Sequence, residues 1–167
     1  MSVSVPQVLY TPAQRARRDA TAWTLVQGVL APVQFLVFLI SLYLVVTSLQ
    51  TGEHTDWALA SVVAKTLVLY AIMVTGAIWE KVVFGQYLFA PAFFWEDVVS
   101  MGVMALHTAY LWVWWQGLWN PTEQLLLALT AYVSYGINAA QYIRKLRMAR
   151  LQKTTPISPF TGAEAST

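Results

Sequence analysis

Residues 79–97 read WEKVVFGQYLFAPAFFWED and lie between two long apolar segments. This stretch carries three carboxyl groups, at Glu80, Glu96 and Asp97, together with the ammonium group of Lys81. Such charges at the ends of apolar segments mark a membrane surface, and a loop that only joined two spans would need none of the large aromatic rings between them. We therefore interpret the stretch as the mouth of a binding site for a flat, hydrophobic molecule.

The composition of the chain sets its class. Hydrophobic residues make up 57% of the 167 residues and charged residues only 11%, which is too little polar surface to cover a soluble globule. The sequence therefore predicts an integral membrane protein. The chain has no cysteine, which excludes disulfides, thiolate metal sites and iron–sulfur clusters. A net charge of +2 is too small to indicate a nucleic-acid partner, so we expect none.

Four apolar segments are long enough to cross a bilayer, which takes about 20 helical residues. They cover about residues 23–49, 57–79, 98–115 and 125–142. The sequence thus predicts an all-α fold, a four-helix transmembrane bundle with short connectors, and assigns 23–142 to the catalytic domain. We expect 1–22 to form a cytoplasmic segment with a short surface helix that begins at Thr11-Pro12, and 143–167 to form a basic and then disordered tail.

Basic residues are distributed asymmetrically around these spans. They precede the first span, follow the fourth and occur once in the 79–97 stretch, whereas the other two connectors contain acidic residues and no Lys or Arg. The positive-inside rule therefore places both termini and the 79–97 stretch in the cytoplasm. No internal repeat is evident, which argues against the duplicated architecture of many transporters.

Two ionisable residues lie inside the predicted spans. Lys65 is about 12 Å from the outer end of the second span. It either reaches the surface or a carbonyl, or it holds a substrate carboxylate or moves protons. His107 lies near the centre of the third span, where it either makes a structural hydrogen bond or ligates a metal. Because Glu96, Ser100 and His107 share one helical face by their spacing, the histidine is connected to the carboxylates at the surface.

The three carboxyl groups have two interpretations. The helix dipole stabilises a carboxylate in the first turn by about 0.3 to 1 kcal/mol, so Glu96 and Asp97 could simply begin the third helix while Glu80 marks the interface. In a partly desolvated aromatic pocket, however, burial and a second carboxyl group nearby favour a protonated carboxyl, which is an acid near neutral pH. The concentration of aromatic rings between these residues favours the second interpretation and general acid chemistry on an apolar substrate.

Several motifs of this sequence are similar to those of a known family. They are YTP at 10–12, WTLVQGVLAP at 23–32, VAKT at 63–66, IWEK at 78–81, YLFAPAFFWEDVVSM at 87–101 and LHTAY at 106–110. By these motifs, the sequence resembles the 3-vinyl bacteriochlorophyllide hydratase family of phototrophic bacteria over nearly the whole chain. The resemblance implies a multi-pass protein of the bacterial inner membrane, either the cytoplasmic or the intracytoplasmic photosynthetic membrane.

The resemblance implies hydration of the 3-vinyl group of chlorophyllide a or 3-vinyl bacteriochlorophyllide a to a 1-hydroxyethyl group, on the route to bacteriochlorophyll a. This addition needs a proton for the terminal vinyl carbon and a water for the inner one. We therefore expect no cofactor, because the magnesium belongs to the substrate macrocycle. We hypothesise that Glu96 or Asp97 donates the proton, while Glu80 or the other carboxylate orients the attacking water.

Under the same resemblance, aromatic and polar residues around one cavity would bind the pigment. These residues are Trp79, Tyr87, Phe93, Phe94, Trp95, Gln27 and Asn138. The rings of Phe93, Phe94 and Trp95 would pack on the macrocycle. His107 could be the axial ligand of its magnesium, and Lys65 could meet its propionate or a keto oxygen. The amides have a strong alternative role, because amides in lipid often bind helices together.

The expected partners are this pigment, membrane lipid, other enzymes of pigment biosynthesis and further copies of the chain in a homo-oligomer. Two other functions would use the same residues. A pigment-binding or assembly subunit would have the same cavity but leave its pigment unchanged. A small transporter or channel would use Lys65 and His107 along a path, which the lack of a repeat and of charges on every span disfavours.

Overall fold

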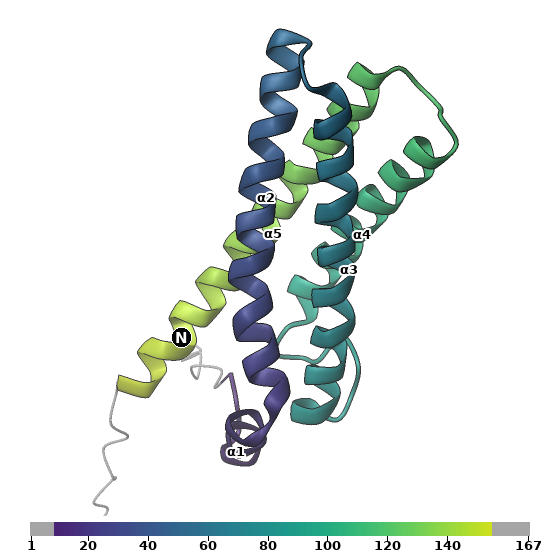
Figure 1. The fold of residues 1–167 in the computed structure, drawn as a ribbon. Coiled ribbons are helices and arrows are strands. Elements are labelled where there is room, and N and C mark those ends of the chain that lie inside the picture. The colour runs from purple at the N-terminus through teal and green to yellow at the C-terminus, as the bar shows by residue number, and fades with distance from the viewer. Residues whose placement is uncertain (1–8, 155–167) are drawn as a thin grey trace, which may run out of the picture.

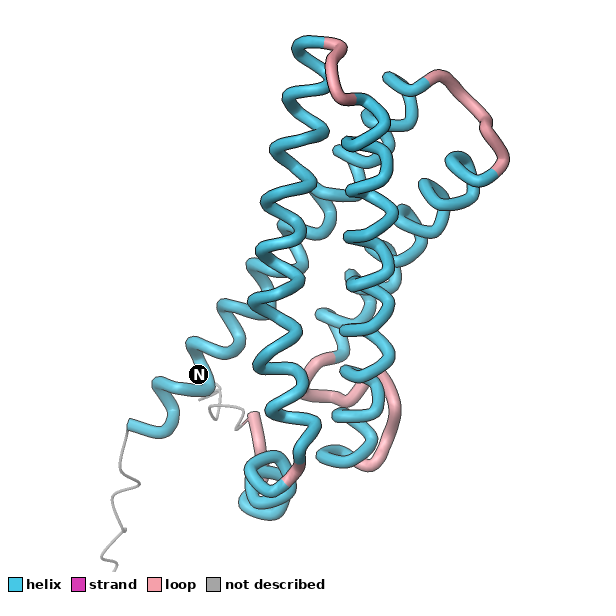
Figure 2. Tube along the Cα trace, in the orientation of Figure 1, coloured by secondary structure: helices cyan, strands magenta, loops and turns pink. Residues whose placement is uncertain are grey.

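The computed structural model describes residues 9–154, with side chains up to residue 148. All regular structure within these bounds is helical (Figure 1 and Figure 2). The helices are α1 (Pro12–Ala20), α2 (Ala22–Thr51), α3 (Thr55–Phe84), α4 (Phe94–Trp115) and α5 (Pro121–Thr154). The predicted all-α fold is therefore confirmed for this part of the chain. The first part of the expected tail continues α5, and residues 155–167 lie outside the described residues.

Among the described residues, α2, α3 and α4 are long and apolar enough to cross a membrane. α5 has 34 residues, and its first half contains the segment 125–142 that we expected to be the fourth span. Its second half carries Arg144, Lys145 and Arg147, which make the helix as a whole less apolar. The protein is thus a membrane protein with three helices able to span.

The long helices pack as two antiparallel pairs. α2 lies along α3 and α4 lies along α5, and α5 also contacts α2 and α3 (Figure 1). The short α1 begins at the predicted cap, where the Thr11 hydroxyl accepts from the Gln14 N–H, and it lies across one end of the bundle against α3. We call this the lower end, as in Figure 1. It also holds the connector between α3 and α4, while the other two loops lie at the upper end.

The connector between α3 and α4 is shorter than predicted. α3 does not end at Trp79 but continues to Phe84, and Gly85 ends it with a φ of 92°. Glycine adopts this left-handed conformation without a Cβ clash, so the helix ends where Gly85 takes it rather than at the first charge. α4 begins at Phe94, which leaves 85–93 as the connector. The charged residues on both sides of it therefore belong to helix ends.

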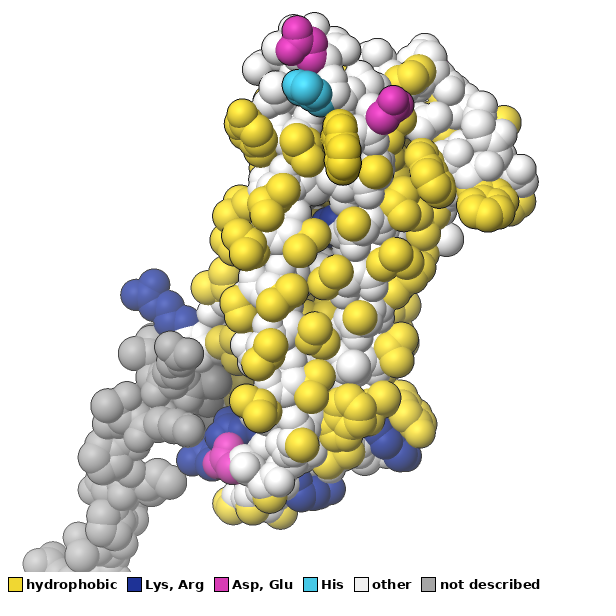
Figure 3. All heavy atoms as spheres, in the orientation of Figure 1, with side chains coloured by type: hydrophobic (Ala, Val, Ile, Leu, Met, Phe, Trp, Pro, Cys, Tyr) yellow, Lys and Arg dark blue, Asp and Glu magenta, His cyan; other side chains and the backbone are white. Residues whose placement is uncertain are grey.

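Apolar side chains from all four long helices form the core of the bundle. Its most deeply buried members include Val45, Val62, Val103, Tyr110, Leu125 and Ala128. A second, smaller cluster at the lower end contains Tyr10, Val83 and Phe93. Exposed apolar side chains run along the outer face seen in Figure 3. An apolar surface of this extent suits contact with lipid.

Candidate active site

Three carboxyl groups gather at the lower end of the bundle. Glu80 lies near the end of α3, and Glu96 and Asp97 lie in the first turn of α4. They expose only 5%, 8% and 2% of their surface, respectively. The two helix ends and the folded connector thus bring together acidic groups that the chain separates by a loop. Buried carboxyl groups need partners, and these come from two different parts of the chain.

Glu80 and Asp97 form a pair. Their carboxyl groups lie close enough to interact, and two buried carboxyl groups this near each other favour a state in which one of them is protonated. The backbone N–H of Phe89 donates to Asp97 Oδ2 at 2.7 Å, and that of Ala90 donates to Glu80 Oε2 at 3.3 Å. Phe89 has a φ of 60°, and a left-handed residue turns successive N–H groups into an anion-binding concavity. The connector therefore holds the pair with two backbone donors.

Helix α5 supplies further polar contacts. The Tyr142 hydroxyl donates to Asp97 Oδ1 at 3.3 Å, and Lys145 Nζ donates to Glu96 Oε2 at 2.6 Å. Glu96 therefore binds a cation, whereas Asp97 belongs to the acidic pair. Lys145 was not expected at the site, because its charge was interpreted only as a sign of topology. Lys145 lies seven residues after Asn138, so both residues are on one face of α5. This spacing is the sequence signal that could have identified Lys145 as a site residue.

Phe93 is the centre of an aromatic cluster beside the acidic pair. Its buried ring lies 5.8 to 6.4 Å, between centroids, from those of Tyr10, Trp79, Phe84 and Tyr142. Trp79 is fixed in turn, because its Nε1 donates to the Thr24 hydroxyl of α2 at 2.9 Å. Burial raises the pKa of the Tyr10 phenol above its usual value, so this ring remains neutral. The cluster forms an apolar wall next to the carboxyl groups.

Phe94 and Trp95 point away from this wall. They are 43% and 70% exposed, and Tyr87 is exposed as well. The Phe94 ring lies 5.8 Å from that of Phe89 and 5.4 Å from that of Trp95. The single aromatic platform expected from sequence is therefore divided, since neighbouring residues in a helix point about 100° apart. Phe93 belongs to the inner wall, and the next two rings form an outer face.

Lys65 and His107 bind each other in the bundle interior. Their Nζ and Nε2 atoms lie 2.7 Å apart, and both residues are fully buried. Because His107 Nδ1 donates to the Val103 carbonyl at 2.8 Å, Nε2 is the atom that accepts from Lys65. The rings of Tyr132 and Tyr135 cover the Lys65 nitrogen, with centroids 5.4 and 4.0 Å away. The lone pair that the axial-ligand hypothesis requires is therefore engaged in this arrangement.

The basic and acidic pairs are separate sites. His107 lies ten residues beyond Asp97 on α4, or about 15 Å along the helix axis. Of the expected polar residues, Asn138 is close to the acidic pair, because its Nδ2 donates at 2.8 Å to Ser100, one turn from Asp97. Gln27 instead donates to a threonine hydroxyl of α3 at 2.7 Å. Within the described residues, no group of three or more His, Asp or Glu side chains is arranged to hold a metal ion.

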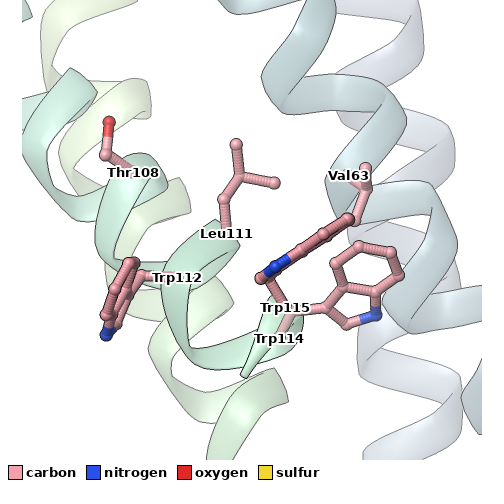
Figure 4. A pocket seen from close by; sticks show the side chains of 6 residues that line it. All are labelled: Val63, Thr108, Leu111, Trp112, Trp114 and Trp115. Atoms are coloured by element: carbon pink, nitrogen blue, oxygen red, sulfur yellow. The ribbon is translucent and has the colours of Figure 1, made fainter. Parts of the chain in front are cut away.

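A hollow of about 400 Å³ lies in the upper half of the bundle (Figure 4). Its lining residues are Val63, Thr108, Leu111, Trp112, Trp114 and Trp115. Trp112 lies fifteen residues beyond Asp97, about 22 Å along α4, so this hollow does not reach the carboxyl groups. Tryptophans gather where a membrane meets water, and the hollow is better explained by contact with lipid.

Comparisons with known proteins agree with one another. A Cereibacter sphaeroides protein named "2-vinyl bacteriochlorophyllide hydratase" is 68% identical over 144 residues, which are 86% of this chain and 89% of that protein. A Rhodobacter capsulatus protein of the same name is 65% identical over 147 residues, 87% of this chain and 85% of that protein. No solved structure is significantly similar to the chain. Residues 10–148 match the family described as 2-vinyl bacteriochlorophyllide hydratase, and the chain belongs to this family.

Proposed function

We propose that this protein adds water to the vinyl group of a bacteriochlorophyllide or chlorophyllide, giving a 1-hydroxyethyl group. This vinyl substituent is numbered 2 or 3 according to the scheme used for the macrocycle. Family membership and the names of both relatives support the proposal. The single observation that carries the mechanism is the pairing of two buried carboxyl groups, those of Glu80 and Asp97, beside an aromatic wall.

In the proposed reaction, Asp97 gives the proton of the pair to the terminal vinyl carbon. Positive charge then develops at the inner carbon and is delocalised into the macrocycle. The oxygen of a water attacks this carbon, and Glu80 accepts the proton that the water loses, which restores a singly protonated pair. One carbon–carbon π bond is lost while one C–H and one C–O bond form, so the balance needs no oxidant, reductant or metal.

The connector stabilises the negative charge of Glu80 and Asp97 after the proton has been transferred to the substrate. Both carboxyl groups are then anionic and buried, which would be costly without donors. The N–H groups of Phe89 and Ala90 already point at Asp97 and Glu80. Donors that are fixed before the reaction stabilise charge as it develops without any reorganisation.

Of the two proton donors left open by the sequence, the geometry favours Asp97 over Glu96. Asp97 lies beside a second buried carboxyl group, whereas Glu96 accepts from the Lys145 amine. We assign Glu96 to holding Lys145 in place at the mouth of the site. This division uses all three carboxyl groups and gives each a different role.

The pigment would enter from the lower end, between the inner wall at Phe93 and the outer face at Phe94 and Trp95. A chlorophyllide carries a free propionate, and we propose Lys145 as its partner, because this amine lies 5.1 Å from the Phe93 ring centroid. Lys65 is a poorer candidate, since it is fully buried and bound to a histidine of α4. We assign that basic pair to fastening α3 to α4.

We also propose that α5 is a fourth crossing and that the lower end faces the cytoplasm of a bacterial inner membrane. Figure 3 supports this orientation, because Lys and Arg side chains gather toward the lower end, whereas the upper connectors contain acidic side chains and a histidine but no Lys or Arg. In this topology 23–142 is the membrane-embedded catalytic domain. The segments 1–22 and 143–167 lie on the cytoplasmic side, where water and other pigment enzymes have access.

The test is direct. Purified protein in detergent is incubated with a 3-vinyl chlorophyllide, and mass spectrometry follows the pigment. We expect the gain of one water in the presence of folded protein and a gain at least about a hundredfold slower with Asp97→Asn. A folded, detergent-stable protein that binds the pigment and leaves it unchanged would overturn the proposal in favour of a pigment-binding subunit.

A further inference from the structure

Two buried amide side chains in the interior of the bundle have unpaired polar atoms. Gln34 of α2 is 2% exposed, and within the described residues neither its Nε2 nor its Oε1 has a hydrogen-bond partner. Asn138 of α5 is 7% exposed; its Nδ2 donates to Ser100, but its Oδ1 is unpaired among these residues. Buried polar atoms in proteins are normally satisfied by protein or by ordered water.

The contacts between α2 and α5 place these amides at the same level. The Ser41 hydroxyl lies 2.6 Å from the Tyr132 hydroxyl, and one turn lower the Phe38 and Tyr135 rings pack at 4.8 Å between centroids. The two helices are therefore antiparallel: toward the lower end, residue numbers decrease along α2 and increase along α5 (Figure 1). The next turn down brings Gln34 level with the segment of α5 around residue 138, to within about 2 Å along the axis.

The contacts between α4 and α5 place this layer next to the acidic pair. Asn138 binds Ser100, and one turn lower Tyr142 binds Asp97. The Tyr142 hydroxyl also interacts with the Ser100 side chain, so it lies between the two levels. The Asn138 end of this layer is thus about one helical turn, some 5 Å, from the carboxyl group that we assign as proton donor.

We propose that Gln34 and Asn138, together with Ser100, bind the water molecule that is added to the vinyl group. This inference rests on the proposed function. A buried water typically makes about three hydrogen bonds, and the layer offers one unpaired donor and two unpaired acceptors. The oxygen of this water forms the new bond to the inner vinyl carbon, one of its protons goes to Glu80, and the other stays on the product hydroxyl. The bundle interior is mostly apolar, and this site would hold the water that the reaction consumes.

The water site can be tested without pigment. In protein labelled with ¹⁵N in its side-chain amides, we expect the Gln34 NH₂ resonance, assigned by its loss in Gln34→Leu, to show a nuclear Overhauser effect to water. The amide of Gln27, whose Nε2 donates to the Thr75 hydroxyl at 2.7 Å, serves as the internal comparison. Absence of water contact at Gln34 would overturn the inference. A water signal in a protein that hydrates no vinyl chlorin would instead overturn the proposed function alone.

The role of this water in the reaction is tested by kinetics. We expect Gln34→Leu and Asn138→Leu to lower kcat by about tenfold or more, while the pigment dissociation constant, measured by fluorescence titration, changes by less than about twofold. The matched control is Gln124→Leu, which also removes a buried amide and should leave kcat per folded molecule unchanged. If Gln34→Leu hydrates the pigment within about twofold of the unsubstituted rate, the inference is wrong. If a variant fails to fold, the nuclear Overhauser effect between Gln34 and water in the unsubstituted protein still tests the inference.

Discussion

The interface between α3 and α4 holds two pairs of buried ionisable side chains, one acidic and one basic. Glu80 and Asp97 meet at the lower end, and Lys65 and His107 meet in the interior. Each pair joins the same two helices, and each is nearly or fully buried. Burial and pairing alone therefore do not distinguish a reactive site from a structural one in this protein.

What distinguishes the pairs is where their other hydrogen bonds go. His107 is held by a carbonyl of its own helix, and tyrosine rings cover Lys65, so the basic pair is closed on itself. The acidic pair receives donors from a loop and from α5, and it lies at helix ends beside the aromatic cluster around Phe93. A group whose partners lie on a connector and a helix end is more accessible to a substrate than one enclosed within the bundle.

The largest expected effect is that of Asp97→Asn. The amide keeps the shape of the side chain but cannot give a proton to carbon, so we expect kcat to fall by about 10² to 10⁴ with pigment binding retained. The measurement is single-turnover hydration followed by mass spectrometry. Asp56→Asn, an exposed carboxyl at the upper end, is the matched control and should not change the rate. Retention of most activity by Asp97→Asn would remove the acidic pair from the mechanism.

The basic pair should respond in stability rather than in chemistry. Lys65→Met leaves His107 Nε2 buried without a donor, so we expect the free energy of unfolding to fall by about 1 to 3 kcal/mol. The double variant with His107→Leu should recover part of this loss, because both polar partners are then replaced by apolar groups. Thermal unfolding in detergent measures both values.

The same variants test the axial-ligand hypothesis. If the basic pair is structural, Lys65→Met and His107→Ala should both retain pigment binding, and each should lower kcat of the folded protein by less than about tenfold. Loss of pigment affinity in His107→Ala alone, with Lys65→Met unaffected, would instead assign His107 to the magnesium of the substrate.

This contrast between the pairs was only partly predictable from sequence. Apolar length identified α2, α3 and α4, and helical spacing correctly placed Glu96, Ser100 and His107 on one buried face. The same spacing could not tell which residues of α3 and α5 that face would meet. The rotation and register of neighbouring helices depend on packing, so the contacts of Lys65 with His107 and of Lys145 with Glu96 were not foreseen.

The connector shows a second limit of the sequence. Charges after an apolar run suggested that α3 ends at Trp79, but the helix continues through Glu80 and Lys81 to the left-handed Gly85. Likewise, three consecutive aromatic residues suggested one platform, whereas the start of α4 at Phe94 divides it. Both differences have one cause, since a helix continues until backbone geometry ends it, whatever the polarity of its side chains.

A smaller effect is expected at the mouth of the site. Glu96→Gln weakens only a partly exposed ion pair, so we expect kcat to fall by roughly two- to fivefold. Lys145→Met removes the proposed partner of the pigment propionate and should raise KM by about tenfold with little change in kcat. Steady-state kinetics separates the two results. A fall in kcat for Glu96→Gln as large as that for Asp97→Asn would transfer the proton-donor role to Glu96.

The smallest effect should come from the exposed aromatic residues, and it decides at which end of the bundle the pigment enters. Trp95 and Trp115 are matched, being 70% and 78% exposed at opposite ends of α4. Replacing Trp95 by Ala removes a ring of the outer face at the lower end, and we expect KM for the pigment to rise roughly two- to tenfold with unchanged stability. Trp115→Ala changes only the upper hollow of Figure 4 and should leave KM unaltered. If Trp115→Ala raised KM while Trp95→Ala did not, the pigment would have to approach through that hollow, and its vinyl group could not reach Asp97 without crossing the level of the basic pair.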